Sequence, residues 1–413
     1  MTKLFSNRLS FQSRLLRGGP ERHSNPLVTP LVQSTTFIQE QLNGTNPFAY
    51  SRVGNPTVSA LEQVLGDLED TVPAICFSSG LAAETALFLA FTKAGDHVVC
   101  GKAVYGGTIR LLQQFLEPLG VTTTFVDATD PTAISAAINE RTKLVFLETP
   151  ANPTLVLTDL RKAALIGHEA GCLVAVDNTF LTSGLQKPLD FGADFSVYST
   201  TKLLDGHSTA LGGAIVGRDE KLLDRLRFTR KSVGSIQTPF NAWLTLNGLK
   251  TLRIRLTRQC RSAQRVAEWL AERNAIDSVN YPGLESFPQR DLAESQHLGL
   301  HGNVISFEVR GGYEAAVRFV KSLQLCRLAE HIGSVESLIT HAASMTHADV
   351  PRPQRIAAGI SDGLLRLSVG LEPPREIISD LRQALKCARQ PDNAVTSNIR
   401  SESNGQLVAE VGG

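Results

Sequence analysis

Short apolar segments alternate with segments of helical spacing between residues 74 and 217. The apolar segments are rich in Val, Ile and Phe: AICFSS, HVVC, TTTFVDA, KLVFLETP, LVAVDNTF, FSVYST and GAIVG. Helical spacing appears between several of them, at 81–92, 108–116, 132–138 and 160–170. Because strands that are apolar throughout are buried on both faces, this alternation predicts an α/β fold with a mainly parallel sheet between two layers of helices.

The pattern changes after about residue 255. A long helix is predicted over 260–273, and it is followed by the strand-like segments VISFEVRG and LLRLSVGLE and by helices near 313–323 and 374–387. These elements indicate a second, smaller α+β domain. We therefore expect an N-terminal arm with little regular pattern, a large domain, a C-terminal domain and a disordered tail, at 1–57, 58–255, 256–387 and 388–413.

The composition excludes several classes of protein. Of the 413 residues, 42% are apolar and 20% are charged, as in ordinary globular proteins. Since 41 Lys and Arg residues balance 40 Asp and Glu residues, no global charge favours nucleic acid or an anionic membrane as a partner. The apolar runs are far shorter than the ~20 residues that span a bilayer.

The cysteines and the N-terminal segment indicate where in the cell the protein is located. Six scattered cysteines without a CxxC pair indicate buried, reduced thiols in a cytoplasmic protein, and they favour neither disulfides nor a metal site. The chain starts with a basic segment that has no acid before Glu21 and no signal-peptide pattern. We interpret this segment as a structural arm and not as a transit peptide.

Ligands of open parallel sheets bind beyond the carboxyl ends of the strands, so the residues after each strand are the candidates for chemistry. After AICF, the segment 78–83 opens a helix whose N-terminus suits a phosphate, although a simple helix cap explains it equally well. After HVVCGKAV, Tyr105 precedes two glycines and could stack on a flat ring or fill a turn. After KLVFLE, Asn152 lies between two prolines, as it would in a plain turn.

Two further strands end in ionisable residues. Asp177 follows LVAV and could hold a protonated ring nitrogen, or it could be a cap or an ion-pair partner. Lys202 follows FSVY in a loop with Ser199 and Thr201, where an amine with a lowered pKa could bind an aldehyde. Taken alone, a surface lysine is the simpler interpretation.

These features together are the parts of a pyridoxal 5'-phosphate (PLP) site. One aromatic residue, one acid, one lysine and two phosphate-binding segments come together at one sheet edge. The fingerprints of nicotinamide-dependent dehydrogenases and of P-loop proteins are missing from the sequence.

The motifs resemble the cystathionine γ-synthase/γ-lyase family of PLP enzymes, which has fold type I. The resemblance covers about residues 12–387 and rests on STTF (34–37), YSRVGNPT (50–57), SSGLAA (78–83), YGGT (105–108), ETPANPT (148–154), VDNTF (176–180), STTKLLDGH (199–207), SMTH (344–347) and RLSVGLE (366–372).

The resemblance implies a role for each matching residue. Lys202 binds the aldehyde of the cofactor and moves protons, Asp177 pairs with the ring nitrogen, and Tyr105 stacks on the ring and acts as an acid or base. The phosphate of the cofactor is held by Gly80, Leu81, Ser199 and Thr201 of one subunit and by Tyr50 and Arg52 of its neighbour. Asn152 and Arg366 bind the α-carboxylate of a small amino-acid substrate. The protein is therefore expected to be a homo-oligomer, a tetramer built from dimers that share active sites.

The resemblance also narrows the reaction. Glu330 and Arg110 are typical of the γ-synthase/γ-lyase branch, which implies γ-replacement or γ-elimination on a sulfur amino acid or an activated homoserine. Both are expected to bind the substrate, and Arg110 could bind a distal carboxylate. The alternatives are an O-acylhomoserine sulfhydrylase, a methionine γ-lyase-like enzyme and γ-substitution of an unusual amino acid in specialised metabolism. The chain departs from the family pattern at Ala49, Val53 and His331, and His331 replaces the usual serine. A catalytically inactive scaffold is disfavoured because the set of functional residues is complete.

Overall fold

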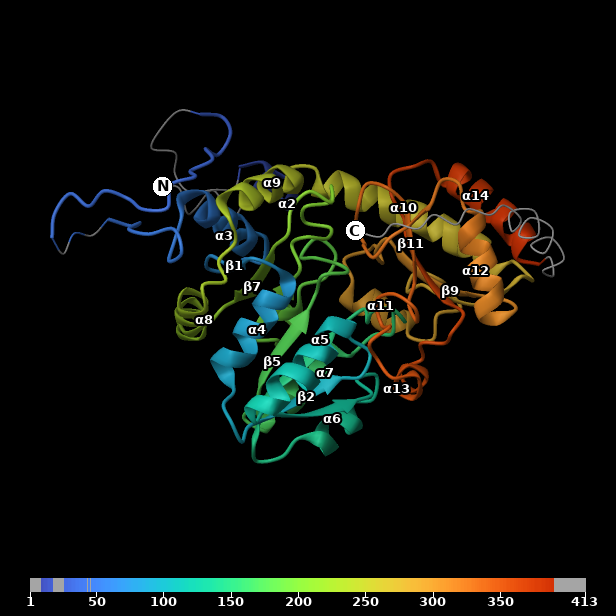
Figure 1. The fold of residues 1–413 in the computed structure, drawn as a ribbon, viewed down its shortest axis with the longest axis horizontal. Helices are drawn as coiled ribbons and strands as arrows, with labels where there is room; N and C mark the ends of the chain where they lie inside the picture. The colour runs from blue at the N-terminus through green and yellow to red at the C-terminus, as the bar shows by residue number, and fades with distance from the viewer. Residues whose placement is uncertain (1–8, 18–25, 43, 45, 390–413) are drawn as a thin grey trace, which may run out of the picture.

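Two sheets of unequal size form the framework of the molecule (Figure 1). The computed structural model describes residues 9–17, 26–42, 44 and 46–389. The seven-stranded sheet has the order β1-β7-β6-β5-β4-β2-β3. Its strands are β1 (Ile75–Phe77), β2 (His97–Gly101), β3 (Thr122–Val126), β4 (Thr142–Glu148), β5 (Leu173–Asp177), β6 (Phe195–Tyr198) and β7 (Gly213–Gly217).

The prediction of a mainly parallel sheet is confirmed. Strands β2 to β6 pair in parallel, whereas β7 is antiparallel to both β6 and β1. Neighbouring residues of β5 belong to different apolar clusters: Ala175 packs in one, and Val174 and Val176 pack in the other. Both faces of this strand are therefore buried, as its continuous apolar sequence requires.

Helices cover the two faces of the large sheet (Figure 1). They are α3 (Pro56–Leu68), α4 (Gly80–Phe91), α5 (Gly106–Arg110), α6 (Pro131–Ala137), α7 (Leu160–Glu169), α8 (Glu220–Val233) and α9 (Pro239–Leu249). The helix expected over 108–116 is instead the short α5 followed by a π-helical turn at Leu111–Leu116.

The smaller sheet has the order β10-β11-β12-β9-β8 and is mixed, since β10 and β11 are parallel and the other pairs are antiparallel. Its strands are β8 (Ile276–Asn280), β9 (Val304–Val309), β10 (Arg327–Leu328), β11 (Leu338–His341) and β12 (Leu364–Ser368). The helices of this part are α11 (Arg290–Gln296), α12 (Gly312–Ser322), α13 (Arg352–Ala357) and α14 (Pro374–Ala388). The 20-residue helix α10 (Leu252–Ala271) joins it to the large sheet and starts eight residues before the helix predicted from Cys260.

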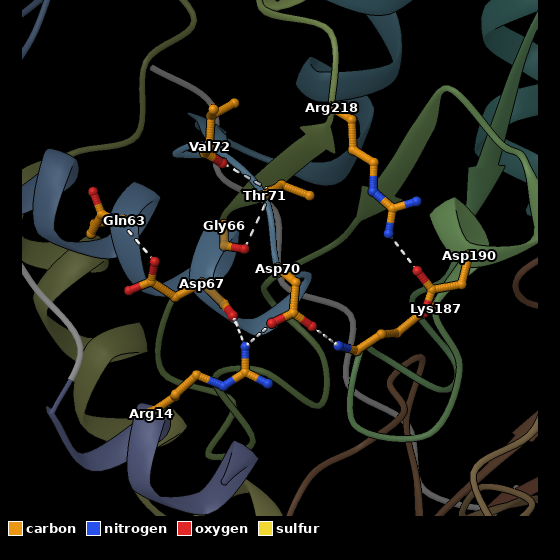
Figure 2. A network of polar contacts seen from close by, with 10 residues as sticks. All are labelled: Arg14, Gln63, Gly66, Asp67, Asp70, Thr71, Val72, Lys187, Asp190 and Arg218. Carbon is orange, nitrogen blue, oxygen red and sulfur yellow. Dashed lines mark hydrogen bonds and ion pairs between the residues drawn. The ribbon is translucent and has the colours of Figure 1, made fainter. Parts of the chain in front are cut away.

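The N-terminal segment is more regular than its composition indicates. It contains helix α2 (Phe11–Arg17), whose Arg14 donates to the carbonyl of Asp67 and to the carboxylate of Asp70 (Figure 2). Lys187 Nζ lies 2.6 Å from the other oxygen of Asp70. Arg14 therefore holds helix α2 against α3 and the turn after it, within a segment that we expected to be irregular. Most of the expected disordered tail, 390–413, lies outside the described residues, as do 1–8 of the expected arm.

All six cysteines are free, and five of them are buried, as expected; Cys387 is instead partly exposed. Within the part of the chain that the structure describes, no helix is both long and apolar enough to cross a membrane.

Candidate active site

Helix α4 starts at the edge of the large sheet with free backbone donors. Ser79 Oγ accepts the N–H of Ala82 at 3.0 Å, but the N–H groups of Gly80 and Leu81 donate to none of the described residues. A Cβ atom on Gly80 would lie 2.9 Å from Cβ of Ser199, so glycine is needed for the loop after β6 to approach. The helix N-terminus and this close loop form a cradle that suits a phosphate.

The loop after β6 carries Lys202. It is closed by Thr201, whose Oγ1 donates to the carbonyl of Gly212 (3.2 Å) and accepts its N–H (3.0 Å). Burial, together with the charge of Arg366, lowers the pKa of Lys202 to about 8. A large fraction of this amine is therefore neutral near pH 8 and able to act as a nucleophile or base.

Buried acids lie at the ends of strands β4 and β5. Glu148 and Asp177 are direct neighbours in the parallel register of these two strands. Asp177 accepts the N–H of Thr179 at 2.8 Å, and burial raises its pKa to about 6 although Lys202 lowers it. Burial, together with the charge of Asp177, raises the pKa of Glu84 to about 8, and Glu84 accepts a hydrogen bond from Thr108.

Glu148 joins two of the predicted site residues. Its carboxylate accepts the N–H of Tyr105 at 2.7 Å and the N–H of Asn152 at 3.0 Å. A Cβ atom on Gly107 would come within 2.4 Å of the Tyr105 ring, so this glycine makes room for the ring. Burial raises the pKa of the Tyr105 phenol, which therefore keeps its proton. Sequence reasoning missed Glu148 and Glu84 as site residues, although Glu148 lies beside Asp177 in the sheet and could have been found from that register.

Arg366 reaches this edge from β12 of the smaller sheet. Its guanidinium donates to Asn152 Oδ1 (2.6 Å) and to Thr340 Oγ1 (3.2 Å), and it is almost fully buried. Burial lowers its pKa to about 10, and Glu148 and Glu330 oppose the change. The structure therefore joins the predicted pair Asn152 and Arg366, which are 214 residues apart in sequence.

Three further residues were singled out in the sequence. His331 and Glu330 lie between β10 and β11 of the smaller sheet, and Arg110 is the last residue of α5. His331 Nδ1 is 3.4 Å from Lys202 Nζ, and the exposed Glu330 precedes it. Arg110, which was expected to bind a distal carboxylate, is paired with Asp349 at 3.0 Å.

Comparison with known proteins agrees with this geometry. A sequence profile described as Cys/Met metabolism PLP-dependent enzyme matches residues 12–386. An L-methionine gamma-lyase from Treponema denticola is 41% identical over 391 residues, which cover 92% of this chain and 97% of that protein. A cystathionine gamma-lyase from Rattus norvegicus is also 41% identical, with coverage of 92% and 96%. The crystal structure of a cystathionine gamma synthase from Xanthomonas oryzae pv. oryzae, in complex with aminoacrylate and cysteine, has a TM-score of 0.89 at 39% identity and coverage of 92% and 98%.

The chain belongs to the family of PLP-dependent enzymes of Cys/Met metabolism. Membership confirms the resemblance, fold type I and the cofactor, and these relatives support γ-elimination or γ-replacement on a small amino acid as the class of reaction.

The residues of the site fit the cofactor of this family. Free N–H groups at the start of α4 match a phosphate, and the buried carboxylate of Asp177 matches a protonated ring nitrogen. The lowered pKa of Lys202 matches an amine that must react with an aldehyde.

Tyr50 and Arg52 lie apart from this group. The Arg52 guanidinium stacks on the ring of Tyr50, 5.4 Å from its centroid, and donates to the carbonyl of Lys231 at 2.7 Å. Apart from this contact with each other, neither has a hydrogen bond, ion pair or ring contact with a predicted site residue in the described part of its own chain. Their expected contact with the cofactor of a neighbouring subunit stays a prediction.

Proposed function

We propose that this enzyme eliminates or replaces the Cγ substituent of a sulfur amino acid or an activated homoserine. The observation that carries the proposal is the convergence of Lys202, Asp177 and Arg366, whose charges act on one another although they come from three separate segments. Lysine, acid and guanidinium are the groups needed to hold PLP and the carboxylate of an amino acid.

The roles of the residues follow from their chemistry. When bound, PLP captures the substrate amine through its aldehyde and withdraws electrons from Cα. Asp177 would hold the ring nitrogen, Tyr105 the ring face, and Gly80, Leu81 and Ser199 the phosphate. Because Thr201 Oγ1 already bonds to Gly212, its contribution is to close the loop around Lys202.

The substrate is oriented by Arg366 and Asn152. A guanidinium binds a carboxylate through two parallel hydrogen bonds, which fixes the orientation of Cα. The neutral fraction of Lys202 then accepts the proton of Cα and transfers protons at Cβ. Tyr105 keeps its proton because burial raises its pKa, so it can protonate the leaving group at Cγ.

A methionine γ-lyase-like reaction is favoured by one specific observation. The Arg110 guanidinium, the candidate ligand of a distal carboxylate, is already paired with Asp349. A substrate such as cystathionine would have to displace this carboxylate, whereas methionine would not. Exposed pairs contribute only about 0–1 kcal/mol, so the competition would change the KM for cystathionine about fivefold at most.

One set of assays tests these proposals. The purified protein should show the visible absorption band of bound PLP, and borohydride should remove the band. Methionine, cystathionine, O-acetylhomoserine and O-succinylhomoserine are then tested with and without cysteine. Formation of 2-oxobutanoate identifies elimination, and a new thioether identifies replacement. The Lys202→Ala variant should lose turnover; undiminished turnover would refute the proposed role of the lysine.

A second assay separates the two substrate classes. In Asp349→Asn the KM for cystathionine should fall relative to wild type while the KM for methionine stays unchanged. Asp277→Asn, which removes the exposed partner of Arg310 on strand β8, is the matched control. An equal change for both substrates would exclude competition at Arg110.

The assembly is also part of the proposal. We propose a cytoplasmic homotetramer made of dimers that share active sites, with Tyr50 and Arg52 acting across the dimer. The support is that Arg52 and Tyr50 contact no other predicted site residue in the described part of their own chain. Mixing inactive Arg52→Ala and Lys202→Ala subunits should restore part of the activity, because some mixed dimers contain one intact site. No recovery in mixed dimers of verified composition would exclude shared sites.

A further inference from the structure

His331 is the group closest to Lys202 that the proposed reaction does not use. Its Nδ1 lies 3.4 Å from Lys202 Nζ, and this is the only hydrogen bond of the amine within the described residues. Lys202 belongs to the loop after β6 of the large sheet, whereas His331 lies between β10 and β11 of the smaller one. The contact therefore crosses between the two parts of the molecule at the reacting amine.

The surroundings keep the imidazole neutral. Burial, followed by the charges of Lys202 and Arg366, lowers the pKa of His331 to about 4, and Asp205 and Glu336 oppose the shift. A neutral imidazole has one acceptor nitrogen and one N–H. Because an ammonium group can only donate, Nδ1 is the acceptor that faces Lys202 and Nε2 carries the hydrogen.

The other ring nitrogen makes no competing contact. Nε2 of His331 is buried and has no hydrogen-bond partner among the described residues. The ring is therefore not held by a bond on its far side, and its contact with Lys202 is the polar contact that orients it. The main chain is held separately, since Arg366 donates to the carbonyl of His331 at 3.5 Å.

We propose that His331 is a positioning residue that holds the amine of Lys202 through Nδ1. The inference rests on the proposed function, in which Lys202 is released from the cofactor and must then reach protons on two carbon atoms. A lysine side chain has four flexible methylene groups, and a misplacement of about 1 Å can lower a rate about a hundredfold. A fixed acceptor beside the amine restricts this motion.

In the apoprotein, His331 also affects the pKa of Lys202. A neutral acceptor binds an ammonium group more strongly than it binds an amine, so His331 raises the pKa of Lys202 relative to a site without the acceptor. The other groups that act on this pair are Asp177 from β5, Arg366 from β12, Glu330 and Glu336 from the loop around His331, and Asp205 from the lysine loop.

The test uses two substitutions of similar size. His331→Asn keeps a short polar acceptor, and His331→Leu removes both nitrogens. In the apoprotein, acetylation of Lys202 by acetic anhydride is followed by mass spectrometry as a function of pH, with the exposed Lys162 as internal reference. We expect the midpoint for Lys202 to move to lower pH in His331→Leu and to stay near the wild-type value in His331→Asn.

Kinetics provide the second measurement. In His331→Leu, kcat and the exchange of the Cα hydrogen of norleucine with deuterated solvent should fall about tenfold to a hundredfold. KM should stay within about twofold, and His331→Asn should recover most of the loss. His168→Asn, on the far surface where His168 pairs with Asp194, is the control. If His331→Leu does not fold, His331→Ala is used with added imidazole, which should restore exchange.

The outcomes separate the inference from the proposed function. An unchanged acetylation midpoint in His331→Leu, or equal losses in the Asn and Leu variants, would overturn the role of His331. If the wild-type protein binds no PLP, or if Lys202→Ala is fully active, the proposed function fails first.

Discussion

Two groups of charged residues in this molecule contain similar side chains but behave in opposite ways. At the surface, Asp70 accepts from Arg14 and Lys187, and these two cations outweigh burial and lower its pKa (Figure 2). At the site, Asp177 and Glu148 at the strand ends and Glu84 of helix α4 are buried within reach of one another's charge, and burial raises the pKa of all three.

The difference lies in whether the acids have cations of their own. Each oxygen of Asp70 has a partner, so this network fastens helix α2 and needs nothing more. The charges of the three buried acids act on one another, and neither Lys202 nor Arg366 forms an ion pair with them in the described part of the chain. Buried charges without compensation cost free energy, so such a group is typical of a site that awaits a cationic ligand. A protonated ring nitrogen is such a ligand.

The largest effect is expected from removing the cation at this site. Arg366→Leu leaves Asn152 without its donor and the substrate carboxylate without its partner. Loss of one partner of a buried charge pair costs about 2–5 kcal/mol, or roughly 30-fold to several thousandfold in kcat/KM. Arg366→Lys keeps the charge without the two parallel hydrogen bonds, so its kcat/KM should lie between those of Arg366→Leu and wild type. If Arg366→Leu had the same kcat/KM as wild type, Arg366 could not be the residue that binds the substrate carboxylate.

A smaller effect is expected from neutralising Asp177. Asp177→Asn keeps the shape of the side chain but removes the charge that would hold a ring nitrogen. A hydrogen bond to a charged group contributes about 1.5–3 kcal/mol, so PLP affinity and Cα exchange should each fall about tenfold to a hundredfold. Fluorescence titration of the apoprotein with PLP measures the affinity. Asp190→Asn, at a surface pair with Arg218, is the control and should bind PLP as wild type does.

The stability of the apoprotein should depend on pH through the buried Glu84. Its pKa is about 8 in the folded protein and near 4.5 when exposed, so between these values the folded state binds more protons. Its contribution to the stability of the apoprotein is therefore present at low pH and is lost as pH rises through 8, by about 1.4 kcal/mol per pH unit at most. Glu84→Gln should melt like wild type at pH 5 and at a higher temperature at pH 8.5. Parallel melting curves at both values would contradict this account.

Much of the large sheet could be predicted from the sequence because its strands are continuous apolar runs. The residues that follow β5 and β6 could be placed at one sheet edge for the same reason, since parallel strands end together. Glu148 was missed because it is the last residue of the strand-like run KLVFLE, and only the residues that follow each strand were considered as candidates. Only the pairing of β4 with β5 reveals that it adjoins Asp177.

Contacts between distant segments could not be predicted from patterns. Arg366 and Asn152 were paired from a family resemblance, because nothing in local spacing joins β12 to the loop after β4. The pairing of Arg110 with Asp349 was not foreseen, since it depends on how the segment before α13 lies against α5. Helix α2 was missed because its seven residues are too short for a periodic pattern and depend on Arg14 for their position.

The smallest effect is expected in the surface network, where Asp70 has a positive φ of 58°. Asp70→Asn tolerates this backbone conformation and removes the charge that Arg14 and Lys187 share. Exposed ion pairs contribute about 0–1 kcal/mol each, so urea unfolding at neutral pH should show a loss of about 1–2 kcal/mol at most.

Because the folded pKa of Asp70 is lowered, its contribution is present above the unfolded pKa of 3.8 and disappears as pH falls through the folded value. The difference between variant and wild type should therefore vanish in acid and shrink in high salt, whereas the effect of Glu84→Gln grows with pH. If Asp70→Asn lowered the free energy of unfolding at neutral pH by much more than 2 kcal/mol, Asp70 could not be described as a weak surface ion pair.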